Sequence, residues 1–116
     1  MRDVKQITAV IQPARLGPVR EALVRAGVTG LTVTDARGFG LQGGSTDTYR
    51  GVEYRVDYVP KVQLTVVVTD TVAASVTEAI AEAARTGRIG DGKIWVTAVE
   101  TVERIRTGDR NEAALV

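Results

Sequence analysis

Residues 61–83 read KVQLTVVVTDTVAASVTEAIAEA, and this stretch decides the fold. Its first half alternates, because Val62, Leu64, Val66 and Val68 are separated by Lys61, Gln63, Thr65 and Val67, which is the two-residue period of a half-buried strand. Asp70 can cap a helix that follows at once. The apolar residues that recur there at helical spacing are Val72, Val76, Ala79, Ile80 and Ala83. The stretch therefore predicts a strand that leads directly into an amphipathic helix, which ends at Arg85-Thr86-Gly87.

The rest of the chain repeats this order. Residues 4–12 alternate, with Ile7, Ala9 and Ile11 on one face. Gly17-Pro18 then opens a helix that Gly27 closes, and its apolar stripe is Val19, Ala22, Leu23 and Ala26. Residues 31–36 and the alternating Ile94, Val96 and Ala98 predict two further strands. Two strand-helix-strand units in succession predict an α+β, ferredoxin-like βαββαβ sandwich in a single domain, residues 1–116, with a long loop between the second and third strands.

Two helices can cover only one face of a four-stranded sheet. The open face is expected to carry Thr32, Thr34, Gln63, Thr65, Val67 and Trp95. A half-apolar open face with the only tryptophan of the chain favours self-association, although an ordinary solvated face is the alternative.

All three tyrosines and the only phenylalanine lie between Gly38 and Tyr58. A loop of about 20 residues is long for a compact domain and is usually functional or disordered. The segment, about residues 38–59, also mixes charged residues with the tyrosines, which suits docking onto a partner. The alternative is a long hairpin that packs on its own fold.

Composition excludes several classes of function. Fifteen basic and fourteen acidic residues give no field for nucleic acid or an anionic membrane, so direct binding to either is not expected. The absence of Cys and His excludes a Cys/His zinc site, an imidazole base and a thiol nucleophile. The N-terminus has no apolar signal region and no apolar run has the length of a membrane span, so we expect a cytoplasmic protein.

Residues 86–93 form a glycine-rich turn that matches Gly-x-x-x-x-Gly-Lys. Ile94 follows the lysine and the order is helix into strand, so the turn is not a P-loop. Glycines still allow backbone N–H groups to approach an anion, and Lys93 adds a charge; a tight turn that needs glycine for its backbone angles explains the residues equally well. Arg104 and Arg106, in the C-terminal segment 102–116, point to one side if the chain stays extended, and the alternative is pairing with Glu100 and Glu103. No acidic pair has a spacing that identifies a general acid and base.

Together these stretches resemble the PII nitrogen-regulatory signal proteins, over Val4 to about Arg110. The matching stretches are Val19 to Leu23, Gly30 to Thr34, Gly38-Phe39-Gly40, Tyr49 to Tyr54, Val59 to Val62, Thr86 to Ile94, and Arg104 to Gly108. The resemblance implies a homotrimer that binds ATP or ADP in clefts between subunits, with 2-oxoglutarate joining Mg-ATP. It also implies a regulatory protein rather than an enzyme, with at most slow incidental ATP hydrolysis, whose long loop (the T-loop) docks on partners.

The resemblance assigns roles by position. Nucleotide contacts are expected from Thr32, Gly40, Leu41, Val67, Thr86, Gly87, Arg88, Gly90, Asp91, Gly92, Lys93, Arg104 and Arg106. Gln42 is expected to ligate Mg²⁺ and, with Lys61, to bind 2-oxoglutarate. Tyr49, Arg50, Glu53 and Tyr54 are the expected partner or modification residues of the loop. The partners implied are an ammonium transporter, a nucleotidyltransferase that modifies glutamine synthetase, and N-acetylglutamate kinase.

The chain also departs from the family pattern. Leu41 replaces the usual Arg, and the other changes near the loop base or anion site are Gly43, Ser45 and Gln12-Pro13-Ala14-Arg15; in the third strand Thr65 replaces a customary Glu. We expect an altered preference for ATP over ADP or an altered 2-oxoglutarate response. One alternative is a divergent PII-like sensor of adenine nucleotides with another small anion, such as bicarbonate. A small ferredoxin-like enzyme acting on a nucleotide is the other.

Overall fold

The computed structural model describes residues 3–40 and 57–115. Its elements, in chain order, are β1 (Val4–Ile11), η1 (Pro13–Arg15), α1 (Leu16–Arg25), β2 (Thr32–Gly38), β3 (Val59–Thr69), α2 (Asp70–Ala84), β4 (Gly92–Val99) and η2 (Asn111–Leu115). Apart from the two short 3-10 helices η1 and η2, this is the βαββαβ order that the sequence predicts.

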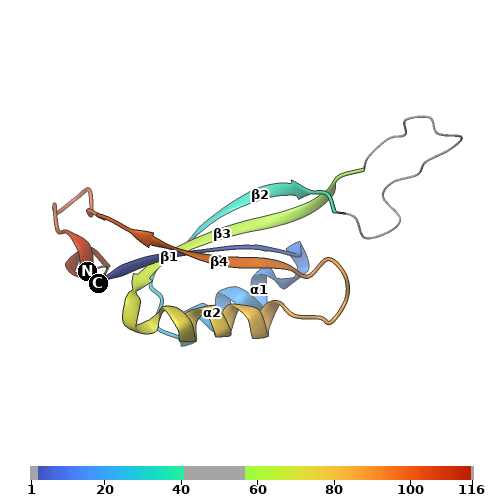
Figure 1. Ribbon diagram of the computed structural model, residues 1–116, viewed down its shortest axis with the longest axis horizontal. Coiled ribbons are helices and arrows are strands. Elements are labelled where there is room, and N and C mark those ends of the chain that lie inside the picture. The colour runs from blue at the N-terminus through green and yellow to red at the C-terminus, as the bar shows by residue number, and fades with distance from the viewer. Residues whose placement is uncertain (1–2, 41–56, 116) are drawn as a thin grey trace, which may run out of the picture.

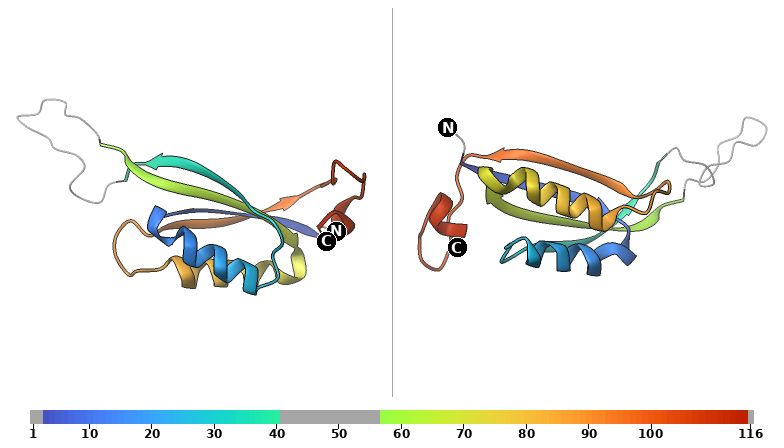
Figure 2. Two further views of the ribbon diagram at one scale, coloured as in Figure 1. Left: turned by 180° about the vertical axis from the view of Figure 1, so that it is seen from behind. Right: turned by 90° about the horizontal axis from the view of Figure 1, so that it is seen from below.

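The four strands form one antiparallel sheet in the order β2-β3-β1-β4. β1 lies inside the sheet, where Ile7 faces Val66 of β3 on one side and Val96 of β4 on the other. Both long helices cover the same face, so the molecule has two layers (Figure 1). C-terminal to β4, the chain ends in η2, which lies at the opposite end of the molecule from the turn between α2 and β4 (Figures 1 and 2).

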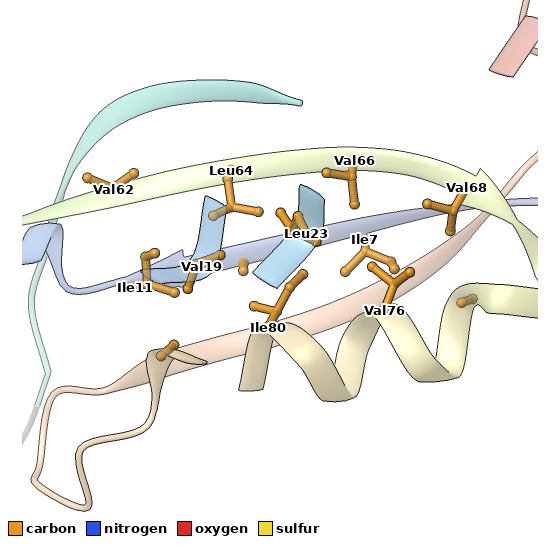
Figure 3. Packing of buried hydrophobic residues seen from close by; sticks show 13 residues of the cluster. Ile7, Ile11, Val19, Leu23, Val62, Leu64, Val66, Val68, Val76 and Ile80 are labelled. Atoms are coloured by element: carbon orange, nitrogen blue, oxygen red, sulfur yellow. The ribbon is translucent and has the colours of Figure 1, made fainter. Parts of the chain in front are cut away.

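The core lies between this face of the sheet and the helices. Figure 3 shows Val62, Leu64, Val66 and Val68 of β3 pointing into it, as their alternation predicts. β1 adds Ile7, Ala9 and Ile11, while α1 adds Val19 and Leu23. Ile7 and Leu64 are completely buried. Because each such side chain contributes about 1.5–3 kcal/mol on burial, this layer is the main source of stability.

The helix α2 faces the sheet with a different stripe from the predicted one. Its buried residues are Ala73, Val76, Ile80 and Ala84. Val76 and Ile80 were predicted correctly, but Val72 is 40% exposed and the burial of Ala79 and Ala83 is only partial. Ala83 still packs against the core, so the prediction was wrong only for Val72 and Ala79. The helix is rich in alanine, and two neighbouring stripes therefore have a similar spacing.

Both ends of the helix α2 also differ in detail from the prediction. Thr69, not Asp70, is the N-cap residue, and no side-chain hydrogen bond caps the helix. The carboxylate of Asp70 instead pairs with Lys5 of β1, with 2.9 Å between Oδ1 and Nζ. At the other end, Arg15 of η1 donates two hydrogen bonds, from Nε (3.0 Å) and Nη2 (2.7 Å), to the carbonyl oxygen of Ala83. Ion pairs and charge-assisted bonds thus fix both ends of α2 to other elements.

The helix α1 ends at Gly27 as predicted. Gly27 has a φ of 92°, its N–H donates to the carbonyl of Val24, and the N–H of Val28 donates to that of Leu23. These two bonds form a Schellman motif, which requires the left-handed conformation that glycine adopts most easily.

The open face carries the predicted residues. The register places Thr32 opposite Thr65, Thr65 opposite Thr8, and Thr8 opposite Trp95, so a row of side chains crosses all four strands. Thr34 and Gln63 are partners in the neighbouring row. Trp95 is 45% exposed and Val96, on the helix side of the edge strand β4, is 41% exposed. Large apolar side chains therefore remain accessible at this edge; whether copies of the chain associate there stays a prediction.

Within residues 3–40 and 57–115, no helix is both long enough and apolar enough to cross a membrane.

Candidate functional site

The turn between α2 and β4 is closed by the carboxylate of Asp91. It accepts hydrogen bonds from the N–H groups of Thr86 (2.8 Å) and Gly87 (2.9 Å) and from the hydroxyl of Thr86 (2.5 Å). The Thr86 side-chain bond, followed by the backbone bonds, lowers the pKa of Asp91 below its ordinary value. These three hydrogen bonds connect the start of the turn, at Thr86 and Gly87, to its end at Asp91.

Glycine is needed at one position of this turn above all. Gly92 has a φ of 106°, and a β-carbon there would lie 1.8 Å from the carbonyl oxygen of Val10 in β1. Gly87 also has a positive φ, of 88°, but nothing within 4 Å of a β-carbon. Gly92 thus serves the turn itself, as the structural interpretation of the motif requires.

Lys61 connects β3 to the turn. Its ammonium donates a hydrogen bond of 2.5 Å to the carbonyl oxygen of Gly90. Lys93 lies beside this contact, and both lysines line a cavity of about 510 Å³. Its lining residues are Val10, Gly38, Phe39, Gly40, Val59, Lys61, Ile89, Gly90, Gly92, Lys93 and Trp95. Five predicted site residues, namely Gly40, Lys61, Gly90, Gly92 and Lys93, are therefore brought together around two positive charges.

A second cavity, of about 620 Å³, lies at the other end of β3. Three predicted residues line it: Thr32 from β2, Val67 from β3 and Arg104 from the C-terminal segment. The chain between α1 and β2, residues 26–31, forms one wall, and Ala114 and Leu115 of η2 form another. The described lining combines aliphatic side chains with several threonines and the guanidinium of Arg104 at the rim, which suits a flat group that carries an anion.

Arg104 is held by the C-terminal segment itself. Its Nη1 donates to the carboxylate of Asp109 at 3.0 Å and to the hydroxyl of Thr107 at 3.4 Å, and its Nη2 donates to the carbonyl of Ala113 at 3.1 Å. Neither Asp109 nor Thr107 was expected at the site. The sequence Thr107-Gly108-Asp109 is typical of a turn, so it predicts that the chain changes direction here. It does not predict that Thr107 and Asp109 contact Arg104.

The arginine pair does not satisfy the condition of an extended chain. Residues 105–107 form a turn, so the two-residue spacing does not place Arg104 and Arg106 on one side. The suggested pairing of the arginines with Glu100 and Glu103 is wrong for Arg104: among residues 3–40 and 57–115 it pairs with Asp109, whereas Glu103 pairs with Arg110, at 3.2 Å. The chain reverses here because Gly108, with a φ of 78°, allows its N–H to return to the carbonyl of Arg104.

Other predicted site residues lie elsewhere. Thr86 and Gly87 are bound to Asp91, and Arg88 is exposed in the same turn. Leu41, Gln42, Tyr49, Arg50, Glu53 and Tyr54 lie outside the described residues. In the described part of the chain, no three acidic side chains gather in the manner of a metal site.

Comparison with known proteins identifies relatives over nearly the whole sequence. The family model of the nitrogen regulatory protein P-II matches residues 4–109. A nitrogen regulatory protein P-II of Pasteurella multocida is 55% identical over 112 residues, which cover 97% of this chain and 100% of the relative. A protein of the same name from Azospirillum brasilense is 54% identical over the same shares. The chain belongs to the PII family.

The structures agree with this assignment. The crystal structure of Arabidopsis thaliana PII bound to citrate matches with a TM-score of 0.81 and 39% sequence identity, over 97% of this chain and 92% of that one. The resemblance inferred from short stretches is therefore confirmed over the length of the domain. As a PII protein, the chain is placed among proteins of nitrogen regulation.

Proposed function

We propose that this PII protein is a signalling protein that binds ATP or ADP in clefts between the subunits of a homotrimer. Mg²⁺ would accompany ATP, with Gln42 and the phosphates as its ligands, and 2-oxoglutarate would join it at Gln42 and Lys61. The long loop, about residues 38–59, would then regulate proteins of nitrogen metabolism. By family resemblance the partners are an ammonium transporter, a nucleotidyltransferase that modifies glutamine synthetase, or N-acetylglutamate kinase.

The observation that carries this proposal is the division of the expected nucleotide residues between two cavities of one chain. Thr32, Val67 and Arg104 line one of them, and Lys61 and Lys93 line the other. On β3 alone, Lys61 and Val67 are six residues apart, about 20 Å at 3.3 Å per residue. Each cavity thus offers part of the expected contacts, and a neighbouring copy of the chain would supply the rest.

The two parts have complementary chemistry. We assign the adenine base to the cavity at Val67, which has many aliphatic side chains in its lining, and the phosphates to the cavity that contains the ammonium groups of Lys61 and Lys93. The Arabidopsis relative is bound to citrate. Citrate, like 2-oxoglutarate, is a small carboxylate, which supports an anionic effector as a ligand class for this protein.

Calorimetric titration of the purified protein with Mg-ATP, with and without 2-oxoglutarate, tests the proposal. We expect ATP to bind, and 2-oxoglutarate to tighten that binding; linkage then requires ATP to tighten 2-oxoglutarate by the same factor. ATP binding without any response to 2-oxoglutarate would indicate an adenylate sensor for which another anion is the effector. No binding of ATP or ADP would contradict the assignment of both cavities.

A further inference from the structure

This inference rests on the proposed function and concerns how the site prepares for a phosphate. Arg104 is the cation at the rim of the cavity lined by Thr32 and Val67. A long arginine side chain loses rotamer entropy when it is fixed in one geometry. A site that already holds the guanidinium in place does not lose that entropy when the ligand binds.

The contacts around Arg104 have this effect. Asp109 lies in an isolated bridge region in which Glu103 pairs with Arg110 in the antiparallel sense. The backbone N–H of Arg104 donates to the carbonyl of Asp109 at 2.8 Å, while the side chains of the same two residues form the 3.0 Å ion pair. The same residue therefore fixes both the backbone and the guanidinium of Arg104.

Thr107 completes the arrangement. Its hydroxyl donates to Oδ2 of Asp109 at 2.9 Å and accepts from Nη1 of Arg104. The hydrogen bond from Thr107 thus orients the Asp109 carboxylate toward the guanidinium of Arg104. The Arg104 side chain is 27% exposed and the Asp109 side chain 46% exposed, so the pair lies at the surface of the rim and not in the core.

We propose that Asp109 is a positioning residue for nucleotide binding: its carboxylate, oriented by Thr107, holds the Arg104 guanidinium at the cavity rim where the ligand's phosphates arrive. The alternative role for a carboxylate at this place is competition with the phosphates for Arg104. The two roles give opposite results when the negative charge is removed and an accepting oxygen is kept.

Calorimetric titration with Mg-ATP of Asp109→Ala, Asp109→Asn and the unchanged protein separates them. Asp109→Ala is expected to weaken ATP binding five- to tenfold, and Asp109→Asn, which still offers an amide oxygen to Nη1, is expected to weaken it by no more than about threefold. Thr107→Val removes the hydroxyl that orients the Asp109 carboxylate and is expected to weaken ATP binding two- to fourfold. An unchanged affinity in Asp109→Ala, or tighter binding in Asp109→Asn, would overturn the proposal.

A double-mutant cycle shows whether Asp109 acts through Arg104. In the background of Arg104→Ala, the further change Asp109→Ala is expected to have no effect on ATP affinity, because its target is already absent. A second loss of the same size in that background would overturn the proposal and indicate a general structural role.

The matched control lies in the same segment. Glu103→Ala removes the ion pair to Arg110, a bond of 3.2 Å, without touching Arg104, and is expected to leave ATP affinity within about twofold. Thermal unfolding of every variant reports whether the domain is intact. Absence of ATP binding by the unchanged protein would refute the proposed function, whereas normal binding with no effect of Asp109→Ala refutes only the present inference.

Discussion

At the scale of single residues, Gly92 is a position where the backbone leaves no room for a β-carbon. Replacement by Ala meets both a positive φ and the Val10 carbonyl at 1.8 Å, so Gly92→Ala is expected to destabilise the fold by about 3 kcal/mol or more. Gly87→Ala meets only the φ and is expected to cost about 1–2 kcal/mol. Denaturant titration of the two variants gives the comparison; equal losses would contradict the role assigned to the Val10 contact.

Asp91 is a residue whose contribution depends on pH. Its pKa in the folded protein is lowered, so its stabilisation is fully present above the unfolded value of 3.8 and is lost as the pH falls through the folded value. We expect Asp91→Asn to be less stable than the unchanged protein at pH 7 and at pH 5, and the difference to shrink toward pH 3. Unfolding free energies measured in parallel at these pH values test this, and a difference independent of pH would count against it.

At the scale of elements, Arg15 joins the N-terminal side of α1 to the C-terminal end of α2. Cations near a helix C-terminus are favourable, and Arg15 also makes two hydrogen bonds to the carbonyl of Ala83. Because its side chain is only half-buried, Arg15→Ala is expected to cost about 1 kcal/mol. Arg20→Ala, at an exposed position of α1, is the control and should stay within about 0.5 kcal/mol of the unchanged protein. Chemical denaturation measures both; a loss in Arg20→Ala as large as that in Arg15→Ala would indicate a nonspecific charge effect.

The positions of the strands and helices were easier to predict from the sequence than the side that the helix α2 turns toward the sheet. Alternation in β1 and β3 identified the buried residues, because a strand offers only two faces and one of them here is apolar. In α2 the predicted and the observed stripe share Val76 and Ile80 but differ at their margins, because alanines such as Ala73, Ala79 and Ala84 have the same hydrophobicity. The side that such a helix presents is decided by its packing on the sheet, which local periodicity does not contain.

The site was predictable to a similar extent. Glycines, Lys93 and Arg104 have signals in the sequence, so their chemical types could be recognised. Their division between two cavities arises because Lys93 lies at the start of β4 and Arg104 follows its end, and the contact of Asp109 with Arg104 follows from a chain reversal at Gly108. A local sequence pattern predicts neither the division between the cavities nor the contact of Asp109 with Arg104. Both depend on how the folded backbone brings separate residues together.

At the scale of the whole molecule, the open face should determine association. Thr65 lies in the row between Thr32 and Thr8, so Thr65→Arg would place a charge in the middle of that face. We expect light scattering to show three chains for the unchanged protein and a single chain for Thr65→Arg. Ser75→Arg, at an exposed position of α2, is the control and should remain assembled.

Trp95 provides an independent readout of the same change. It is the only tryptophan of the chain and is 45% exposed in the single chain, so covering the open face should remove it from water. Its emission is expected to shift to longer wavelength in Thr65→Arg but not in Ser75→Arg. Identical emission in assembled and dissociated protein would place the interface elsewhere.

The position of β1 has a consequence for how the chain acquires its fold. β1 is synthesised first, yet both of its neighbours in the sheet, β3 and β4, come from the second half of the chain. Pairing between segments so distant in sequence requires large loops to close. The chain loses the entropy of loop closure before the strand contacts can stabilise it, and this slows folding. An incomplete chain that lacks β4 leaves one edge of β1 without its partner, so the sheet reaches its final form only when the C-terminal third has been made.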